Sequence, residues 1–272
     1  MVATPIGNLG DISPRAVEVL SSADVIYCED TRHSRPLCEH FGIKTLLKSY
    51  HEHNEAERVS EILLLLKAGK SIALISDAGT PLISDPGFQL VRAAQVGNFE
   101  VIAIPGACAA VAALSVAGLP TDSFLFAGFL PAKSKAKKDH LVDLFAQACT
   151  VICYESTHRI IDTLECCQLV NPERELVLAK ELTKSHEAVV RGTAQQILAW
   201  LHADEKRTQG EFVLLIAADP NANQHSDEVT LSVDQLLHAL RPLLPSKQVA
   251  SVVCALTGHS KNTLYQRLLN TK

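Results

Sequence analysis

The fold is decided by a strand and the long loop after it, SIALISDAGTPLISDPG at residues 71–87. The apolar run 71–75 is typical of a buried strand, and a helical pattern begins directly after the loop, at Phe88. Loops at the carboxyl ends of parallel strands are where open α/β sheets bind ligands. The glycines of this loop permit positive φ and close backbone approach, and its prolines stiffen it. The stretch therefore predicts a ligand-binding loop in an α/β fold, without naming the ligand.

Strand and helix signals alternate on both sides of this loop, which predicts a mostly parallel sheet. A second strand-to-helix corner, PGACAA at 105–110, would turn backbone N–H groups at a helix N-terminus toward a bound molecule. The helix after it ends at Gly118, so we place a domain boundary there and expect an N-terminal α/β domain over 1–118. We expect its strands at 2–4, 24–28, 43–48, 71–75 and 100–104.

A second α/β domain is expected over 119–219; it begins with the run 123–130 and has strands at 150–154, 175–181, 187–191 and 211–217. Several of these strands have no helix between them, which predicts a mixed sheet. Residues 219–226 are polar and rich in turn formers, as in a linker. Three helical patterns within 229–272 predict a small helical domain that resembles a helix-turn-helix.

Composition excludes several classes of protein. Apolar residues make up 47% of the chain and charged residues 20%, and no apolar run approaches the ~20 residues that span a bilayer. No signal peptide is recognised and the eight cysteines form no CxxC pair, so we expect a cytoplasmic protein without disulfides or membrane contact. His51 and His53 have no partner at zinc spacing, so we expect no metal. The net charge is −5, with a mildly basic C-terminal segment that hints at an anionic partner.

A set of corner motifs occurs in a fixed order along the chain. They are TPIGNL at 4–9, EDTRH at 29–33, the loop 76–87, PGACAA at 105–110, YESTHR at 154–159 and KELTK at 180–184. In these motifs the sequence resembles the tetrapyrrole-methylase superfamily, over essentially its whole length, and within it the small-subunit ribosomal RNA methyltransferases.

The resemblance implies a cleft between two α/β domains that holds S-adenosylmethionine. It also implies a homodimer that methylates the ribose 2′-oxygen of a cytidine in the decoding centre of 16S ribosomal RNA, within the small ribosomal subunit. The cofactor contacts that we expect from it are Pro5, Asp77, Ala78, Gly79, Thr80, Ile83, Cys108, Ala109, Tyr154, Glu155 and Leu182. Asp77 and Asp85 are interpreted as loop formers and as acceptors that face a sulfonium or a hydroxyl, rather than as bases or metal ligands. The sequence AGTP at 78–81 stands where tetrapyrrole-specific members usually carry Gly-Gly-Asp-Pro, which argues against a porphyrin-precursor substrate.

Methyl transfer to a ribose hydroxyl is helped by a positioned base, by ~10²–10⁴-fold. Ionisable residues at strand ends are the catalytic candidates, namely Glu29, Asp30, Arg32, His33, Lys180 and Glu181, with Lys184 and Glu187 beside them. In our hypothesis Arg32 holds a phosphate, and a carboxylate or His33 lies near the hydroxyl. In the alternative interpretation, Asp30 and Arg32 cap the following helix and pair with each other.

A lysine-rich segment, with Lys133, Lys135, Lys137 and Lys138, is a candidate track for RNA phosphates. A solvated loop would show the same composition.

Two other functions are considered beside RNA methylation. One is a small-molecule, tetrapyrrole-like methyltransferase of the same fold, and the other is a non-catalytic nucleic-acid-binding regulator.

Overall fold

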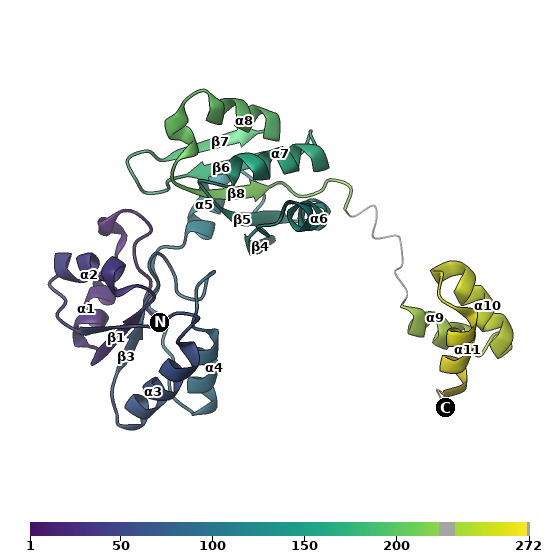
Figure 1. Ribbon diagram of the computed structural model, residues 1–272, viewed down its shortest axis with the longest axis horizontal. Coiled ribbons are helices and arrows are strands. Elements are labelled where there is room, and N and C mark those ends of the chain that lie inside the picture. Colours follow the sequence, from purple (N-terminus) through teal and green to yellow (C-terminus); the bar gives the residue numbers. More distant parts are fainter. Residues whose placement is uncertain (223–231, 271–272) are drawn as a thin grey trace. The chain divides into compact units, whose positions relative to one another are not determined.

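The computed structural model describes residues 1–222 and 232–270 (Figure 1). The chain forms two compact units, Met1–Pro220 and Asn221–Lys272. The α/β elements all lie in the first unit and the second is helical, as predicted. The boundary that we placed near Gly118 would divide the first unit, and it stays a prediction.

The N-terminal sheet is parallel, with strand order β2-β1-β3. Its strands are β1 (Val25–Cys28), β2 (Leu46–Ser49) and β3 (Ile72–Leu74). The N-terminal segment extends this sheet, because the N–H of Val2 donates to the carbonyl of Leu74 at 2.9 Å. The strands predicted at 2–4 and 100–104 are reduced to isolated bridges, from Val2 to Ile104 and from Thr4 to Gly79.

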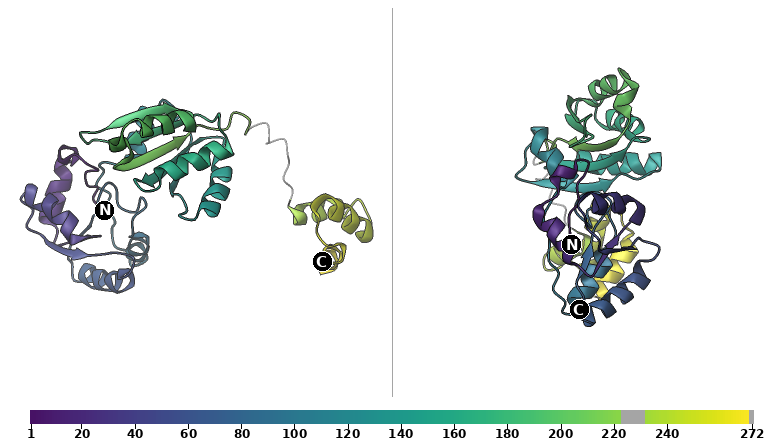
Figure 2. Two further views of the ribbon diagram at one scale, coloured as in Figure 1. Left: turned by 45° about the horizontal axis from the view of Figure 1, so that its top comes forward. Right: turned by 90° about the vertical axis from the view of Figure 1, so that its left-hand side faces the viewer.

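Helices cover both faces of this sheet (Figures 1 and 2), and its central strand β1 is accordingly buried along its whole length, whereas the edge strand β2 is partly exposed and carries Lys48. The helices are α1 (Pro14–Ser22), α2 (Thr31–His40), α3 (Glu55–Lys67) and α4 (Phe88–Val96). Residues of α1 and α2 pack with Ile26 on one face, and residues of α3 and α4 pack with Tyr27 on the other. Ser13 caps α1 as predicted, since its hydroxyl accepts the N–H of Ala16 at 3.1 Å.

Charged side chains join α3 to strand β2. The Glu61 carboxylate accepts hydrogen bonds from Lys48 of β2 and from Arg58, one turn earlier in the helix. The bond from Lys48 is the largest cause that lowers the pKa of Glu61, to about 2. Glu61 is therefore ionised at neutral pH.

The second sheet is mixed, as predicted, with strand order β4-β5-β8-β6-β7. Its strands are β4 (Phe124–Phe129), β5 (Thr150–Ser156), β6 (Leu176–Lys180), β7 (Ala188–Gly192) and β8 (Glu211–Ile216). Only the pair β4 and β5 is parallel. The last strand of the unit, β8, thus lies in the centre of the sheet between β5 and β6.

Helices also cover both faces of the second sheet (Figure 1). On one face lie α6 (Ser134–Phe145), α7 (Ile160–Val170) and α8 (Ala194–His202). On the other face lies α5 (Ala109–Ala117), which directly follows the predicted 105–110 corner. Short 3-10 turns at Leu9–Asp11 and Glu205–Thr208 complete the unit.

The C-terminal unit contains α9 (Val233–Leu240), α10 (Ser246–Thr257) and α11 (Lys261–Asn270). Its own core is formed by Leu237, Val249, Ala250, Val253, Leu264 and Leu268. Gly258 ends α10 with φ of 70°, a left-handed conformation that favours glycine. The three helices predicted here are confirmed. No helix in the described ranges is long and apolar enough to cross a membrane.

Candidate functional site

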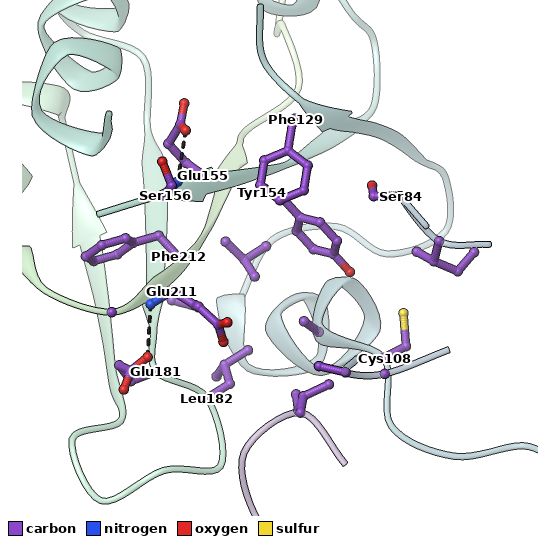
Figure 3. A pocket seen from close by; sticks show the side chains of 18 of the residues that line it. Ser84, Cys108, Phe129, Tyr154, Glu155, Ser156, Glu181, Leu182, Glu211 and Phe212 are labelled. Atoms are coloured by element: carbon purple, nitrogen blue, oxygen red, sulfur yellow. Dashed lines mark hydrogen bonds between the residues drawn. The ribbon is translucent and has the colours of Figure 1, made fainter. Parts of the chain in front are cut away.

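A cavity of about 730 Å³ lies within the first unit (Figure 3). The loop 77–85 and the N-terminus of α5 line it on one side, and the second sheet with the loop after β6 lines it on the other. Its volume falls in the range of ~300–1,000 Å³ that is typical of small-molecule sites. Its wall combines apolar side chains, exposed backbone and five carboxyl groups: Asp77, Asp85, Glu155, Glu181 and Glu211.

The loop 76–87 is tied to two other predicted corners. The backbones of Gly79 and Thr4 exchange two hydrogen bonds, of 2.9 and 3.1 Å. Gly79 has φ of 83°, which an L-residue rarely adopts. The hydroxyl of Thr80 donates to the carbonyl of Ala107 at 3.0 Å. Three corners that are separate in sequence therefore form one wall.

Backbone strain is concentrated at this cavity. In residues 1–222 and 232–270, five residues other than glycine have positive φ, and four of these five lie in two loops beside the cavity. Leu82 and Ser84 have φ of 74° and 70°, and Glu181 and Thr183 have φ of 49° and 68°. Each such residue costs on the order of 1–3 kcal/mol, and such residues cluster at functional sites. The strain supports a functional role for both loops.

Aromatic rings form the apolar part of the wall. Tyr154 of β5 stands edge-on to Phe129 of β4, with ring centroids 5.6 Å apart. The Tyr154 hydroxyl accepts the N–H of Ala110, in the first turn of α5, at 3.2 Å. Burial raises the pKa of Tyr154, so this hydroxyl stays protonated at neutral pH. Tyr154 therefore joins the second sheet to the helix N-terminus at the cavity wall.

Two of the five carboxylates, Glu155 on β5 and Glu181 directly after β6, are held by hydrogen bonds from neighbouring groups. Glu155 accepts the Thr163 hydroxyl at 2.7 Å and the N–H of Ser156 at 2.9 Å. Glu181 accepts Lys184 Nζ at 2.8 Å and the N–H of Glu211 at 2.9 Å. Burial opposes the change, but these two hydrogen bonds lower the pKa of Glu181. Both carboxylates therefore already have hydrogen-bond donors within the protein.

Asp77 connects the loop to the EDTRH corner. Its carboxylate accepts the N–H of Asp30 at 3.1 Å and lies 3.1 Å from Nδ1 of His33. Asp85 has a different environment. Burial raises its pKa to about 6, and the charges of Glu29 and Asp77 add to the shift, while a hydrogen bond with Ser76 opposes it.

The structure brings most of the predicted cofactor contacts together. The predicted contacts that line the cavity are Asp77, Ala78, Gly79, Thr80, Ile83, Cys108, Ala109, Tyr154, Glu155 and Leu182. Pro5 does not line it, although its neighbour Ile6 does. The roles of these residues stay predictions.

The predicted catalytic residues are dispersed. Of them, Glu181 and Lys184 line the cavity, while Lys180 is buried in β6 with 4% exposure. The Asp30 carboxylate caps α2 and binds Arg32 Nε at 3.0 Å and Nη2 at 2.6 Å, and hydrogen bonds from Arg32 lower its pKa to about 2. This geometry is that of the alternative, capping interpretation. His33 contacts Asp77 of the loop 76–87, and Glu29 lies close enough to Asp77 to be affected by its charge. The catalytic roles of all these candidates stay predictions.

The predicted lysine track is divided. Lys133, Lys135 and Lys138 are exposed around the start of α6. Lys137 is only 1% exposed, and its ammonium donates to Asp162 of α7 at 2.5 Å. Lys137 therefore serves an ion pair between α6 and α7, and the RNA-binding role of the segment stays a prediction.

Sequence reasoning does not identify several lining residues, among them Phe129 and the segment 210–213. The segment 210–213 begins β8, and no sequence signal shows that this late strand enters the centre of the sheet. No group of three or more potential metal ligands is found in the described part of the chain.

Comparison with known proteins places both units. Residues 1–198 match the family described as Tetrapyrrole (Corrin/Porphyrin) Methylases, and residues 227–272 match the RsmI C-terminal HTH domain. Ribosomal RNA small subunit methyltransferase I of Haemophilus influenzae is 48% identical over 267 residues, which cover 98% of this chain and 94% of that protein. The protein of the same name from Escherichia coli O157:H7 is 45% identical, over 99% of this chain and 93% of that protein.

Solved structures agree on the fold. A cobalt precorrin-4 methyltransferase superimposes with a TM-score of 0.58 at 16% identity, over 79% of this chain and 92% of that chain. A diphthine synthase gives 0.59 at 14% identity, over 82% and 92%. A uroporphyrin-III C-methyltransferase from Thermus thermophilus, solved in complex with S-adenosylhomocysteine, gives 0.52 at 15% identity, over 79% and 95%.

Proposed function

Because the chain belongs to the tetrapyrrole methylase family, and within it to the ribosomal RNA small subunit methyltransferase I family, we propose that it methylates a ribose 2′-oxygen. The acceptor is a cytidine in the decoding centre of 16S ribosomal RNA. The observation that carries the proposal is the match to these relatives over 98–99% of the chain, through both the cavity unit and the C-terminal helices. A small-molecule methyltransferase or a non-catalytic regulator leaves one of the two units without a role.

The methyl donor is S-adenosylmethionine, and the cavity residues fit it. Bound there, the donor supplies an electrophilic methyl group on a positively charged sulfonium. Asp77, Asp85 and Glu211 supply negative charge for such a cation, and Ile83, Leu182 and Tyr154 supply apolar surface for its adenine. The wall contains no phosphate-binding loop, and the donor carries no phosphate.

The RNA is expected to reach the cavity past β4 and α6. Phe129 lines the cavity at the end of β4, and the exposed Lys133, Lys135 and Lys138 follow within the connection to α6 and its first turn. Cations in this position would contact backbone phosphates on either side of the target nucleotide. The chain as a whole has a net charge of −5, so this exposed basic segment is a favoured contact.

The test is methyl transfer from labelled S-adenosylmethionine to three acceptors: unmodified small ribosomal subunits, naked 16S RNA and a small-molecule extract. We expect label in 16S RNA, at one cytidine, as an alkali-resistant dinucleotide, because a 2′-O-methyl group blocks alkaline cleavage at that position. Label on a base, or in small molecules only, would refute the proposal. The comparison of subunits with naked RNA shows which form is the substrate.

We also propose, from the family resemblance, that the enzyme acts as a homodimer in the cytoplasm. Size-exclusion chromatography with light scattering measures its mass directly. A mass of about 29.4 kDa at assay concentrations, that of a single chain, would contradict the dimer.

A further inference from the structure

We propose that Asp85 is the general base that accepts the proton of the acceptor hydroxyl. The inference rests on the proposed function, because it names the residue that assists that reaction. It also reverses the interpretation of Asp85 from sequence, where the residue serves as a loop former and not as a base.

Asp85 is distinguished by what the other carboxylates of the cavity bind. Glu155 is paired with Arg159, Glu181 and Glu211 share Lys184, and Asp77 lies against His33. In the described ranges, Asp85 is the one lining carboxylate without such a cationic partner. A base must be free to take a proton, and a carboxylate held by an arginine or lysine is a weaker base.

The backbone around Asp85 is conformationally constrained. Ser84 has φ of 70° and Gly87 has φ of 135°, and Pro86 restricts the backbone of Asp85 directly before it. The loop also lies against β4, because a Cβ on Gly128 would be 3.4 Å from the Ser84 hydroxyl. These constraints limit the directions that the Asp85 carboxylate can take, and general base catalysis depends on such positioning.

The electrostatic surroundings support the same role. Three ionisable groups face Asp85 from different elements: Glu29 after β1, Asp77 after β3 and Tyr154 on β5. None of the three is a cation. Burial and the two acids raise the pKa of Asp85 to about 6, closer to neutrality than an ordinary aspartate. The group is thus mostly ionised at pH 7 and yet more basic than an exposed carboxylate, as efficient proton transfer requires.

The proposed step is an in-line displacement with a sulfonium compound as methyl donor. The ribose 2′-oxygen forms a bond to the methyl carbon as the carbon–sulfur bond breaks, and the electron pair of that bond remains on sulfur. The hydroxyl proton passes to the carboxylate of Asp85, which later releases it to solvent. Charge balances, because one positive charge leaves the sulfonium and one proton is taken up by the base.

The test compares wild type with Asp85→Asn, Asp85→Glu and a control, Asp122→Asn, at an exposed aspartate outside the cavity. Single-turnover methylation of small subunits is measured against pH, and S-adenosylhomocysteine affinity is measured by calorimetry. For Asp85→Asn we expect a rate ~10²–10⁴-fold lower with near wild-type affinity. The wild-type rate should fall below pH about 6, and this acidic limb should be absent from the residual activity of Asp85→Asn.

The possible outcomes separate the two proposals. Wild-type protein that does not methylate ribosomal RNA overturns the proposed function, and the base assignment with it. Active wild type with an unchanged rate and pH profile in Asp85→Asn overturns the base assignment alone, as does a parallel loss of S-adenosylhomocysteine affinity. If Asp85→Asn does not fold, Asp85→Glu decides, because its carboxylate is retained but displaced. A folded Asp85→Glu should bind normally and react more slowly, and a wild-type rate in it overturns the assignment.

Discussion

The hydrogen bond between Tyr154 and α5 can be tested by removing a single oxygen atom. In Tyr154→Phe the ring keeps its place beside Phe129, but the N–H of Ala110 loses its acceptor. Ala110 is 4% exposed, so this N–H lies in the protein interior at the first turn of the helix. The variant therefore removes the oxygen that joins β5 to the start of α5.

A buried donor left without a partner costs about 1–3 kcal/mol. The cavity beside Tyr154 admits water, which can replace part of the lost bond, so we expect the low end, about 1 kcal/mol. For a protein of this size, 1 kcal/mol corresponds to a decrease in Tm of about 2–4 °C. Because Cys108 and Ala109 at the same helix end line the cavity, the affinity for S-adenosylhomocysteine should also decrease.

Thermal unfolding by circular dichroism and binding by calorimetry measure the two effects. Tyr265→Phe is the matched control, since the Tyr265 hydroxyl makes no hydrogen bond within the described ranges and the residue lies outside the cavity. A Tm for Tyr154→Phe equal to that of wild type would refute the reasoning. An equal decrease in both variants would show that the effect is not specific to the hydrogen bond.

Three further predictions follow from the structure. Gly87→Ala should lower Tm clearly more than Gly42→Ala, because a Cβ at Gly87 would lie 2.7 Å from Leu82, whereas the one at Gly42 meets nothing within 4 Å; equal shifts would contradict this. The pKa of Glu61 is lowered to about 2, so the stabilising effect of its ionised form is present above its unfolded pKa of ~4.3 and is lost as pH falls through about 2. The free energy of unfolding of Glu61→Gln should therefore depend less steeply on pH in that interval, and an unchanged dependence would count against the ion pairs. Lys137→Met should lower Tm and leave the salt dependence of RNA binding unchanged. Replacing Lys133, Lys135 or Lys138, which are exposed, by alanine should each reduce the slope of log K against log salt concentration by up to ~0.7–0.9, and the reverse pattern would contradict the structure.

Local features of the fold are readable from sequence because neighbouring residues create them. Ser13 and Thr193 cap their helices through bonds to N–H groups three residues ahead, and Gly118 and Gly258 end theirs in left-handed conformations. Strands are less certain, since a strand exists only through its partner. The apolar run 100–104 resembles the other strands in composition, but it meets only the short N-terminal segment and forms a single bridge there.

Lys137 shows the same limit for a side chain. In sequence it belongs to a lysine-rich, apparently solvated segment. In the folded protein α7 brings Asp162 to it, and the ammonium is buried. A charge pattern along one helix carries no information on what a second helix places against it.

The candidate site divides in the same way. From sequence alone came the corner loops, since a loop at the end of a parallel strand is recognised by its own glycines, prolines and polar residues. The tertiary structure decided which carboxylates remain available within the cavity. Asp77 is engaged by the corner before α2 and Glu181 by the start of β8, while Asp85 has no cation beside it. These partners come from segments far apart in the chain, so only the folded arrangement of strands and helices determines them.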